Sequence, residues 1–224
     1  MSPQSQALQQ VLQTLENVAA VTERPAARLL AVSKTKPPEA VRALAEAGQQ
    51  AFGENYVQEA VAKMASLRDL SLEWHLIGHL QSNKCREAAA HFDWVQSLDR
   101  ARLVEPLNRF REGHPPLQVL IQVNPDGEAG KSGCAPEEIG ALARLVAQAP
   151  NLCLRGLMAI PEPVADPERR RETFRRLRAW FDGLRVDHPQ ADTLSMGMSG
   201  DFELAAAEGA TLVRIGSLLF GERG

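Results

Sequence analysis

The stretch LLAVSKTKPP, residues 29–38, joins an apolar run to a polar turn and two prolines. A short run that is hydrophobic on both faces is typical of a parallel strand buried between two layers of structure. Pro38 then begins a helical pattern that ends at Gly48, and proline at the start with glycine just past the end is the usual arrangement for a helix. The stretch therefore predicts a strand, a turn and a helix, with Lys34 at the carboxyl end of the strand.

The same strand-then-helix unit recurs along the chain. Eight extended candidates alternate with helical patterns, at residues 29–33, 50–53, 73–77, 94–97, 118–123, 154–159, 193–196 and 212–215. Eight such units are the number in a (β/α)8 barrel, so the predicted fold class is an α/β TIM barrel. Residues 4–21 predict an extra N-terminal helix, and we expect residues 1–224 to form a single domain. The alternative is an open doubly wound sheet, although no GxGxxG motif follows the first strand.

Composition and charge narrow the class of protein. The chain of 224 residues is 44% hydrophobic and 24% charged with a formal net charge of -3, which is ordinary for a soluble globular protein and gives no reason to expect nucleic acid or an anionic membrane as a partner. No apolar stretch reaches the roughly 18 residues of a membrane span, and no signal peptide is visible. Cys85, Cys134 and Cys153 show no close spacing, so we expect no disulfide framework, no metal site and a cytoplasmic location.

Lysine is rare in this chain. Of the 25 Lys and Arg residues, only five are lysines: Lys34, Lys36, Lys63, Lys84 and Lys131. A desolvated lysine can lose its proton and form an imine with an aldehyde, whereas a guanidinium stays charged and is a poor nucleophile. Lys34, at a strand end, is therefore a candidate for imine formation. The alternative is a surface lysine in the turn before the prolines.

Two loops that contain glycine follow the last two predicted strands. The first holds Ser199 and Gly200, and the second holds Gly216 and Ser217. In a barrel of this kind, phosphate is often bound after strands seven and eight, by backbone N–H groups and hydroxyls next to glycine. The four residues are therefore candidates for a phosphate site. For Ser199 alone, the alternative is that it caps a helix predicted over residues 201–208.

Polar residues in and after the strands are further candidates. Arg214 lies between two apolar residues and is expected to point into the barrel, where it either donates a fixed hydrogen bond to a ligand or pairs with an interior acid. Asn55 follows the second strand and either contacts a ligand ring or caps a helix, and Glu54 is expected to pair with a nearby lysine. His75 and His79 lie in a strand and its following turn and need not share a face, so a zinc pair is not expected.

A cluster of arginines follows the sixth predicted strand. Its members are Arg169, Arg170, Arg171, Arg175, Arg176 and Arg178. Acidic residues are interleaved with them on a predicted amphipathic helix. A solvated helix face is therefore a better explanation than a nucleic-acid site.

Six motifs of this sequence occur together in a known family. They are AVSKTKP (31–37), FGENYVQE (52–59), WHLIGHLQSNK (74–84), LRGLMAIP (154–161), TLSMGMSGD (193–201) and VRIGSLLFG (213–221). In this order they resemble the pyridoxal phosphate homeostasis protein family, the single-domain relatives of the alanine-racemase-like barrel. The similarity covers nearly the whole chain, and the conjunction of motifs is highly specific.

The resemblance implies a role for each candidate residue. It implies that Lys34 carries pyridoxal 5′-phosphate (PLP) as an internal aldimine, with Arg214 near the pyridine nitrogen and Asn55 beside the ring. It also implies that four residues of the two late loops hold the phosphate: Ser199, Gly200, Gly216 and Ser217.

The resemblance further implies a function without robust catalysis. Members of the family bind the cofactor and influence the cellular pools of vitamin B6 and amino acids, and they are not known as enzymes. A racemase of this barrel type needs a second base opposite the cofactor, and the only tyrosine of this chain is Tyr56. We therefore expect a carrier or buffer of PLP that has no catalytic residues, is a monomer, and has apo PLP enzymes as candidate recipients. The alternative is a small PLP-dependent amino-acid racemase or a Schiff-base aldolase.

Overall fold

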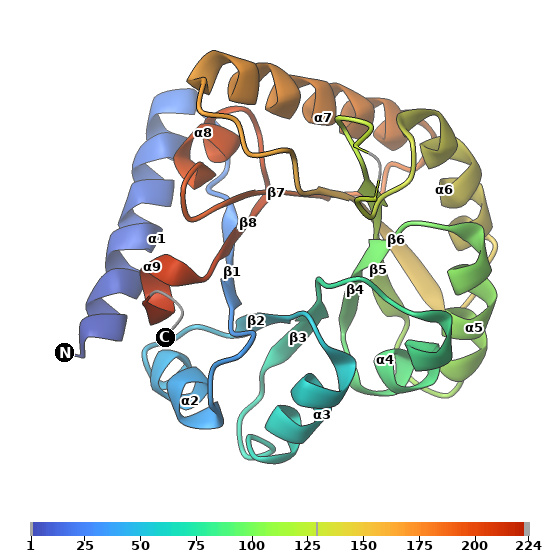
Figure 1. Ribbon diagram of the computed structural model, residues 1–224, viewed down its shortest axis with the longest axis horizontal. Helices are drawn as coiled ribbons and strands as arrows, with labels where there is room; N and C mark the ends of the chain where they lie inside the picture. Colours follow the sequence, from blue (N-terminus) through green and yellow to red (C-terminus); the bar gives the residue numbers. More distant parts are fainter. Residues whose placement is uncertain (1, 129, 222–224) are drawn as a thin grey trace.

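A computed structural model of the protein describes residues 2–128 and 130–221, and within them eight parallel strands form a closed barrel surrounded by helices (Figure 1). The strands follow one another around the barrel in sequence order. They are β1 (Arg28–Val32), β2 (Ala51–Glu54), β3 (Glu73–Leu76), β4 (Trp94–Leu98), β5 (Leu117–Val123), β6 (Leu152–Ala159), β7 (Thr193–Met198) and β8 (Leu212–Ile215). The predicted fold class is therefore confirmed, and each predicted strand overlaps an observed one.

Helices cover the outside of the barrel. They are α1 (Pro3–Thr22), α2 (Pro38–Glu46), α3 (Val57–Ala65), α4 (Cys85–His91), α5 (Val104–Phe110), α6 (Ile139–Ala147), α7 (Pro167–Asp187), α8 (Phe202–Ala207) and α9 (Ser217–Phe220). Short 3-10 turns precede three of them, at Ser82–Lys84, Ala101–Leu103 and Pro136–Glu138. The predicted extra N-terminal helix is α1, which runs alongside α8 and α9 (Figure 1). Within the described part of the chain, every helix is too short or too polar to cross a membrane.

The barrel closes through the pairing of its first and last strands. Leu30 of β1 lies opposite Arg214 of β8, and Val32 of β1 lies opposite Gly53 of β2. Because all the strands are parallel, their carboxyl ends lie at the same end of the barrel. The turn after β1, which contains Lys34, is therefore brought beside the loop after β8.

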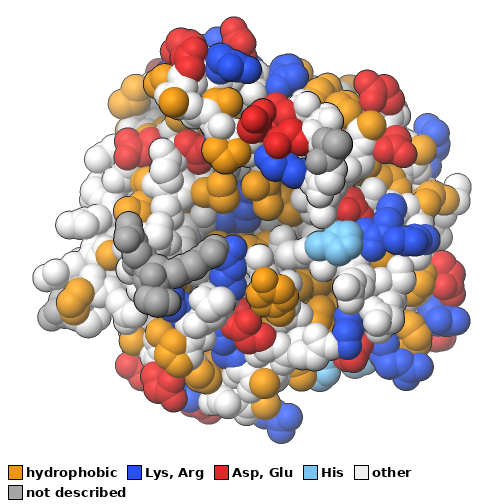
Figure 2. Space-filling model, viewed as in Figure 1, with side chains coloured by type: hydrophobic (Ala, Val, Ile, Leu, Met, Phe, Trp, Pro, Cys, Tyr) orange, Lys and Arg blue, Asp and Glu red, His pale blue; other side chains and the backbone are white. Residues whose placement is uncertain are grey.

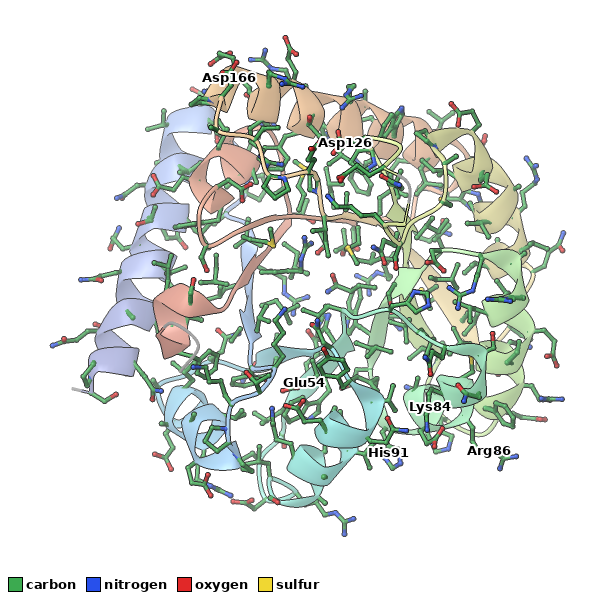
Figure 3. The ribbon with its side chains drawn as sticks, viewed as in Figure 1. Glu54, Lys84, Arg86, His91, Asp126 and Asp166 are labelled. Carbon is green, nitrogen blue, oxygen red and sulfur yellow. The ribbon has the colours of Figure 1, made fainter. Side chains whose placement is uncertain are left out.

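Side chains fill the space on both sides of the sheet. The main core lies between strands and helices and includes the fully buried Phe52 and Phe174. Smaller apolar clusters, such as Trp94 with Leu120 and Met158, lie apart from the main core. Figure 3 shows that side chains occupy the interior of the ring of strands. Several buried side chains are polar, and they are described below with the site.

Candidate functional site

A cavity of about 320 Å³ opens at the carboxyl end of the barrel. It is lined by all seven residues singled out in the sequence, namely Lys34, Asn55, Ser199, Gly200, Arg214, Gly216 and Ser217. The lining is completed by Val32, Thr35, Lys36, Ile77, Ile160, Met198 and Gly221. Figure 2 shows a hollow near the centre of this face, with basic and hydrophobic side chains in it. The structure thus brings together residues from the ends of β1, β2, β7 and β8.

The two late loops are joined by a hydrogen bond. The backbone N–H of Gly216 donates to Oγ of Ser199 at 3.3 Å. Asp201 holds the first loop in shape, because its Oδ1 accepts from the N–H of Met198 at 2.7 Å and its own N–H donates to the Met198 carbonyl at 3.0 Å. Ser199 therefore links two loops, and Asp201 occupies the N-cap position of α8 instead. The capping alternative for Ser199 is wrong.

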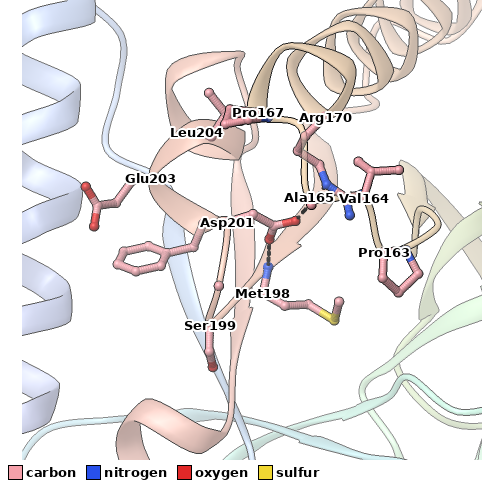
Figure 4. A pocket seen from close by; sticks show the side chains of 12 residues that line it. Pro163, Val164, Ala165, Pro167, Arg170, Met198, Ser199, Asp201, Glu203 and Leu204 are labelled. Carbon is pink, nitrogen blue, oxygen red and sulfur yellow. Dashed lines mark hydrogen bonds and ion pairs between the residues drawn. The ribbon is translucent and has the colours of Figure 1, made fainter.

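Arg170 supports the same loop from α7 (Figure 4). Its Nε lies 3.3 Å from Oδ2 of Asp201, and its Nη2 donates to the carbonyl of Glu162 at 2.6 Å. Arg170 is buried, and Arg171 and Arg175 form ion pairs with Glu208. The prediction of a solvated helix face is therefore wrong for Arg170, whereas Arg169, Arg175 and Arg176 are exposed, as that prediction expects.

Arg214 is a fixed cation inside the barrel. Its side chain donates from Nη1 to Oγ of Ser195 and from Nη2 to the carbonyl of Ala159, both at 2.7 Å. Burial lowers the pKa of Arg214 to about 10, so the guanidinium remains charged at neutral pH. Both of these acceptors are uncharged oxygens, which distinguishes Arg214 from the alternative of a pair with an interior acid.

The turn that carries Lys34 is clamped on its amino-terminal side by a buried ion pair. Oγ of Ser33 donates to Oε1 of Glu54 at 2.6 Å, and Nζ of Lys63 donates to the same oxygen at 2.6 Å and to the Ser33 carbonyl at 2.7 Å. Figure 3 shows Glu54 on the α3 side of the barrel. Burial raises the pKa of Glu54, and the hydrogen bonds from Lys63 and Ser33 oppose that shift. The prediction that Glu54 pairs with a lysine is confirmed, and the partner is Lys63.

The same turn is held on its carboxyl-terminal side by a second acid, Glu59 of α3. The N–H of Thr35 donates to Oε1 of Glu59 at 2.7 Å. Thr35 has φ of 64°, a left-handed conformation that is unfavourable for a β-branched residue. Ser33 and Thr35 are thus both anchored to neighbouring elements, and Lys34 lies between them.

The position of Asn55 depends on a close approach between the loop after β2 and the loop after β3. A Cβ added at Gly78 would lie 2.2 Å from the carbonyl oxygen of Asn55, so only glycine fits at position 78 in this arrangement. Tyr56 occupies the N-cap position of α3 and Asn55 lines the cavity. The alternative that Asn55 caps α3 is therefore wrong.

The two candidate histidines lie in different surroundings. His75 is fully buried, whereas the side chain of His79 is 50% exposed and its Nδ1 lies 3.0 Å from Oγ of Ser132. Within residues 2–128 and 130–221, His, Cys, Asp and Glu form no group of three or more that could hold a metal ion.

Sequence reasoning missed several residues that shape the site. Lys63, Glu59 and Gly78 hold the loops in place, and Ile160 and Met198 add an apolar wall to the cavity. A position directly after a strand was the available signal for Ile160. Glu59 and Lys63 are the two charged residues of α3, and no local pattern shows that they contact the turn of Lys34.

Known proteins resemble this chain along most of its length. The family described as alanine racemase, N-terminal domain, matches residues 6–224. A pyridoxal phosphate homeostasis protein of Pseudomonas aeruginosa is 57% identical over 196 residues, which cover 87% of this chain and 84% of the relative. A protein of the same name from Vibrio cholerae is 48% identical over 230 residues, covering 96% of this chain and 98% of the relative.

Solved structures show the same architecture. PipY of Synechococcus elongatus PCC7942, solved with PLP bound, has a TM-score of 0.81 and 40% sequence identity, covering 93% of this chain and 100% of that chain. Alanine racemase from Corynebacterium glutamicum has a TM-score of 0.72 at 17% identity, covering 98% of this chain and 61% of that chain, and it shows the fold alone. The sequence relatives and the barrel lead to the same conclusion: this chain belongs to the pyridoxal phosphate homeostasis protein family, within the wider family of alanine racemase N-terminal domains.

Proposed function

We propose that this protein binds PLP in the cavity at the carboxyl end of the barrel, carries or buffers it, and takes part in vitamin B6 and amino-acid homeostasis. One observation carries the proposal: seven residues selected from separate motifs line a single cavity. The homeostasis proteins that share up to 57% identity with this chain, and PipY with PLP bound, support the choice of ligand.

The residues of the cavity suit the two reactive parts of this cofactor. PLP supplies an aldehyde that condenses reversibly with a primary amine, and a phosphate dianion. We assign the amine to Lys34, held between two anchored neighbours. We assign the phosphate to the loops of Ser199 with Gly200 and of Gly216 with Ser217, because hydroxyls and backbone N–H groups next to glycine suit an anion.

We assign the ring to Arg214 and Asn55, and this assignment argues against robust catalysis. A guanidinium at the pyridine nitrogen donates a hydrogen bond without giving up its proton, so it weakens the electron sink on which PLP catalysis depends. Tyr56, the only tyrosine, is 60% exposed and lines a neighbouring cavity with His79. We therefore propose no catalytic residues, and we favour a carrier over a racemase or an aldolase.

Other parts of the proposal concern the protein as a whole. The family match over residues 6–224 supports a single domain. A monomeric state, apo PLP enzymes as recipients and a cytoplasmic location remain predictions, and they are separate from the choice of ligand.

A visible spectrum of the purified protein tests cofactor binding first. We expect yellow protein whose colour is lost on borohydride reduction, with the cofactor then fixed to the chain. Colourless protein that takes up no PLP would contradict the proposal.

Transfer to an apo-transaminase tests the carrier role. Loaded protein is mixed with the apo-transaminase and a trap for free PLP, and recovered transaminase activity is compared with that given by free PLP under the same conditions. Faster recovery from the loaded protein supports carriage, whereas equal recovery reduces the role to buffering. Alanine racemisation at ordinary enzyme rates, about 1–10³ s⁻¹, would overturn the non-enzyme assignment.

A further inference from the structure

A series of hydrogen bonds leads from the cofactor cavity into the barrel. Nη1 of Arg214 donates to Oγ of Ser195 at 2.7 Å, and this hydroxyl lies 2.7 Å from Oε1 of Gln96. Nε2 of Gln96 lies 2.8 Å from Nδ1 of His75. The four residues come from β8, β7, β4 and β3, and all are buried. They form a polar chain across the inside of the sheet.

The polar chain continues to the opposite end of the barrel. Nε2 of His75 lies 2.7 Å from Oε1 of Glu73, and Nη2 of Arg28 donates to the same oxygen at 2.7 Å. Glu73 and Arg28 line a second cavity of about 600 Å³, separate from the cavity that holds Arg214. The polar chain, defined as Arg214, Ser195, Gln96, His75 and Glu73, thus joins two cavities through the barrel.

The chemistry of Arg214 sets the direction of every bond in the polar chain. A guanidinium only donates, so the Ser195 hydroxyl accepts from it and turns its own hydrogen toward Gln96. The amide oxygen of Gln96 must then face Ser195, and the amide NH₂ must face His75. An NH₂ group only donates, so Nδ1 of His75 has to accept and carries no proton.

The chemistry of Glu73 sets the direction of the hydrogen bond at the other end of the polar chain. An ionised carboxylate only accepts, so Nε2 of His75 must carry the proton and donate it. Burial acts to raise the pKa of Glu73, but the hydrogen bond with His75, the charge that His75 carries when it is protonated at low pH, and the charge of Arg28 lower that pKa to about 2, so Glu73 is ionised at neutral pH. The two ends therefore agree on one state of His75, which is neutral with its proton on Nε2.

The surroundings of His75 favour the same state. The imidazole stacks on Trp94 of β4, with ring centroids 5.0 Å apart and planes inclined by 11°. The charged groups that act on it are Glu73 on its own strand, Arg28 on β1 and Asp93 before β4. Burial, the largest effect, lowers the pKa of His75. A proton on Nδ1 would also face the Gln96 NH₂ group and break the series.

We propose that Ser195, Gln96 and His75 are positioning residues that hold Arg214 in one orientation toward the cofactor cavity, and that the polar chain admits only neutral His75 with its proton on Nε2. The state of His75 is independent of any ligand, whereas the effect on PLP rests on the proposed function. Each hydrogen bond between buried members of the polar chain can form in one donor-to-acceptor direction only. Replacing a member by an apolar residue therefore leaves its neighbours without a hydrogen-bond partner.

The protonation state of His75 can be measured on the protein without PLP. ¹⁵N NMR of histidine-labelled protein resolves the two ring nitrogens, and the His75→Gln variant assigns the signal among the five histidines. We expect a protonated Nε2 and an unprotonated Nδ1 at pH 7. Gln96→Glu should convert His75 to the doubly protonated form, because a carboxylate accepts from both Ser195 and Nδ1. An imidazolium, or a proton on Nδ1, in the wild type would overturn the proposed chain.

Matched glutamine variants test the effect on the cofactor. Gln96→Leu should weaken PLP binding roughly tenfold, the equivalent of one buried hydrogen bond, and should shift the absorption maximum of bound PLP. Gln49 is also buried but donates to the carbonyls of Leu29 and Ala51, outside the polar chain. Gln49→Leu should therefore leave the absorption maximum unchanged.

The remaining outcomes separate this inference from the proposed function. Gln96→Glu should retain most of the affinity for PLP, because it keeps the series of hydrogen bonds connected. If Gln96→Leu does not fold, Ser195→Ala takes its place in the comparison. Equal effects of Gln96→Leu and Gln49→Leu on affinity and absorption would show that the polar chain serves folding only. Wild-type protein that binds no PLP would overturn the proposed function, and the NMR measurement would still test the polar chain.

Discussion

The hydroxyl of Ser199 accepts a hydrogen bond from the backbone N–H of Gly216, which ties the loop after β7 to the loop after β8. The two loops therefore form one wall of the cavity and are expected to respond together to a ligand. Because the link uses a lone pair of Ser199, the hydrogen of that hydroxyl is directed elsewhere and is suited to an anion in the cavity.

Removing the hydroxyl of Ser199 or Ser217 tests this wall. Ser199→Ala and Ser217→Ala should each weaken PLP binding by about 1–3 kcal/mol, the range for a lost charge-assisted hydrogen bond. The dissociation constant is measured by spectroscopic titration. Pyridoxal, which lacks the phosphate, serves as the matched ligand and should be much less affected. An equal loss for both ligands would mean that the serines act through folding.

Lys34 and Lys36 both line the cavity, and they form a natural comparison. Lys34→Ala should abolish covalent attachment of the cofactor. Lys36→Ala should leave it largely intact, because Nζ of Lys36 donates to the carbonyl of Phe220 at 3.2 Å and so has a structural contact. Borohydride reduction followed by peptide mapping locates the label. Label on Lys36 or Lys131 in the wild type would contradict the assignment.

Gly78→Ala should displace the loop of Asn55, since the new Cβ would lie 2.2 Å from a backbone oxygen. We expect a loss of about 1–3 kcal/mol in the free energy of unfolding, as for overpacking, together with weaker PLP binding. Gly183, within α7, has no atom within 4 Å of an added Cβ. Gly183→Ala is therefore the control and should stabilise the protein by about 0.5–1 kcal/mol. Similar results for both variants, measured by urea unfolding, would refute the close-approach argument.

Lys63 and Glu54, the buried ion pair that contacts the turn of Lys34, should show a large coupling energy in the stability of the protein. Lys63→Met leaves a buried carboxylate without its cation and should reduce the free energy of unfolding by about 3–5 kcal/mol. The double variant with Glu54→Gln should lose less than the sum of the single variants. A double-mutant cycle by urea unfolding gives the coupling energy. Simple additivity would show that the two side chains act independently.

His75 should make the stability of the protein depend on pH. Its pKa is lowered in the folded state from the ordinary 6.5, so below that pH the unfolded chain binds a proton that the folded chain does not. Stability is thus present above the ordinary value and is lost as pH falls toward the folded pKa, with a slope of up to about 1.4 kcal/mol per pH unit. Urea unfolding between about pH 7 and 5 should show a shallower slope for His75→Gln than for wild type. An equal slope for His75→Gln and wild type would contradict this prediction.

Local sequence patterns determined the elements of this protein and the positions of its candidate site. Hydrophobic runs separated by helical periodicity predicted the eight strands, and Pro38 with Gly48 predicted the bounds of one helix closely. The candidate residues were found because parallel strands place their carboxyl ends together, so a polar residue after a strand is informative even without contacts. Lys34 and Asn55 were selected in this way, whereas Arg214 was selected because it lies between two apolar residues of the last strand.

Only the tertiary structure decided which of these residues touch and which charges are buried. Lys63 is the partner of Glu54, Arg170 is buried against Asp201, and Ser195 joins Arg214 to Gln96. These contacts join residues that are far apart in the sequence or indistinguishable from their neighbours by local pattern. The contacts of Ser195 exist because β8 pairs with β1 and closes the sheet, which turns alternate side chains of distant strands toward one interior. The contacts of Lys63 and Arg170 instead join α3 to β2 and α7 to the loop after β7. Periodicity encodes which face of an element is apolar, whereas the identity of a buried polar partner depends on the closed barrel.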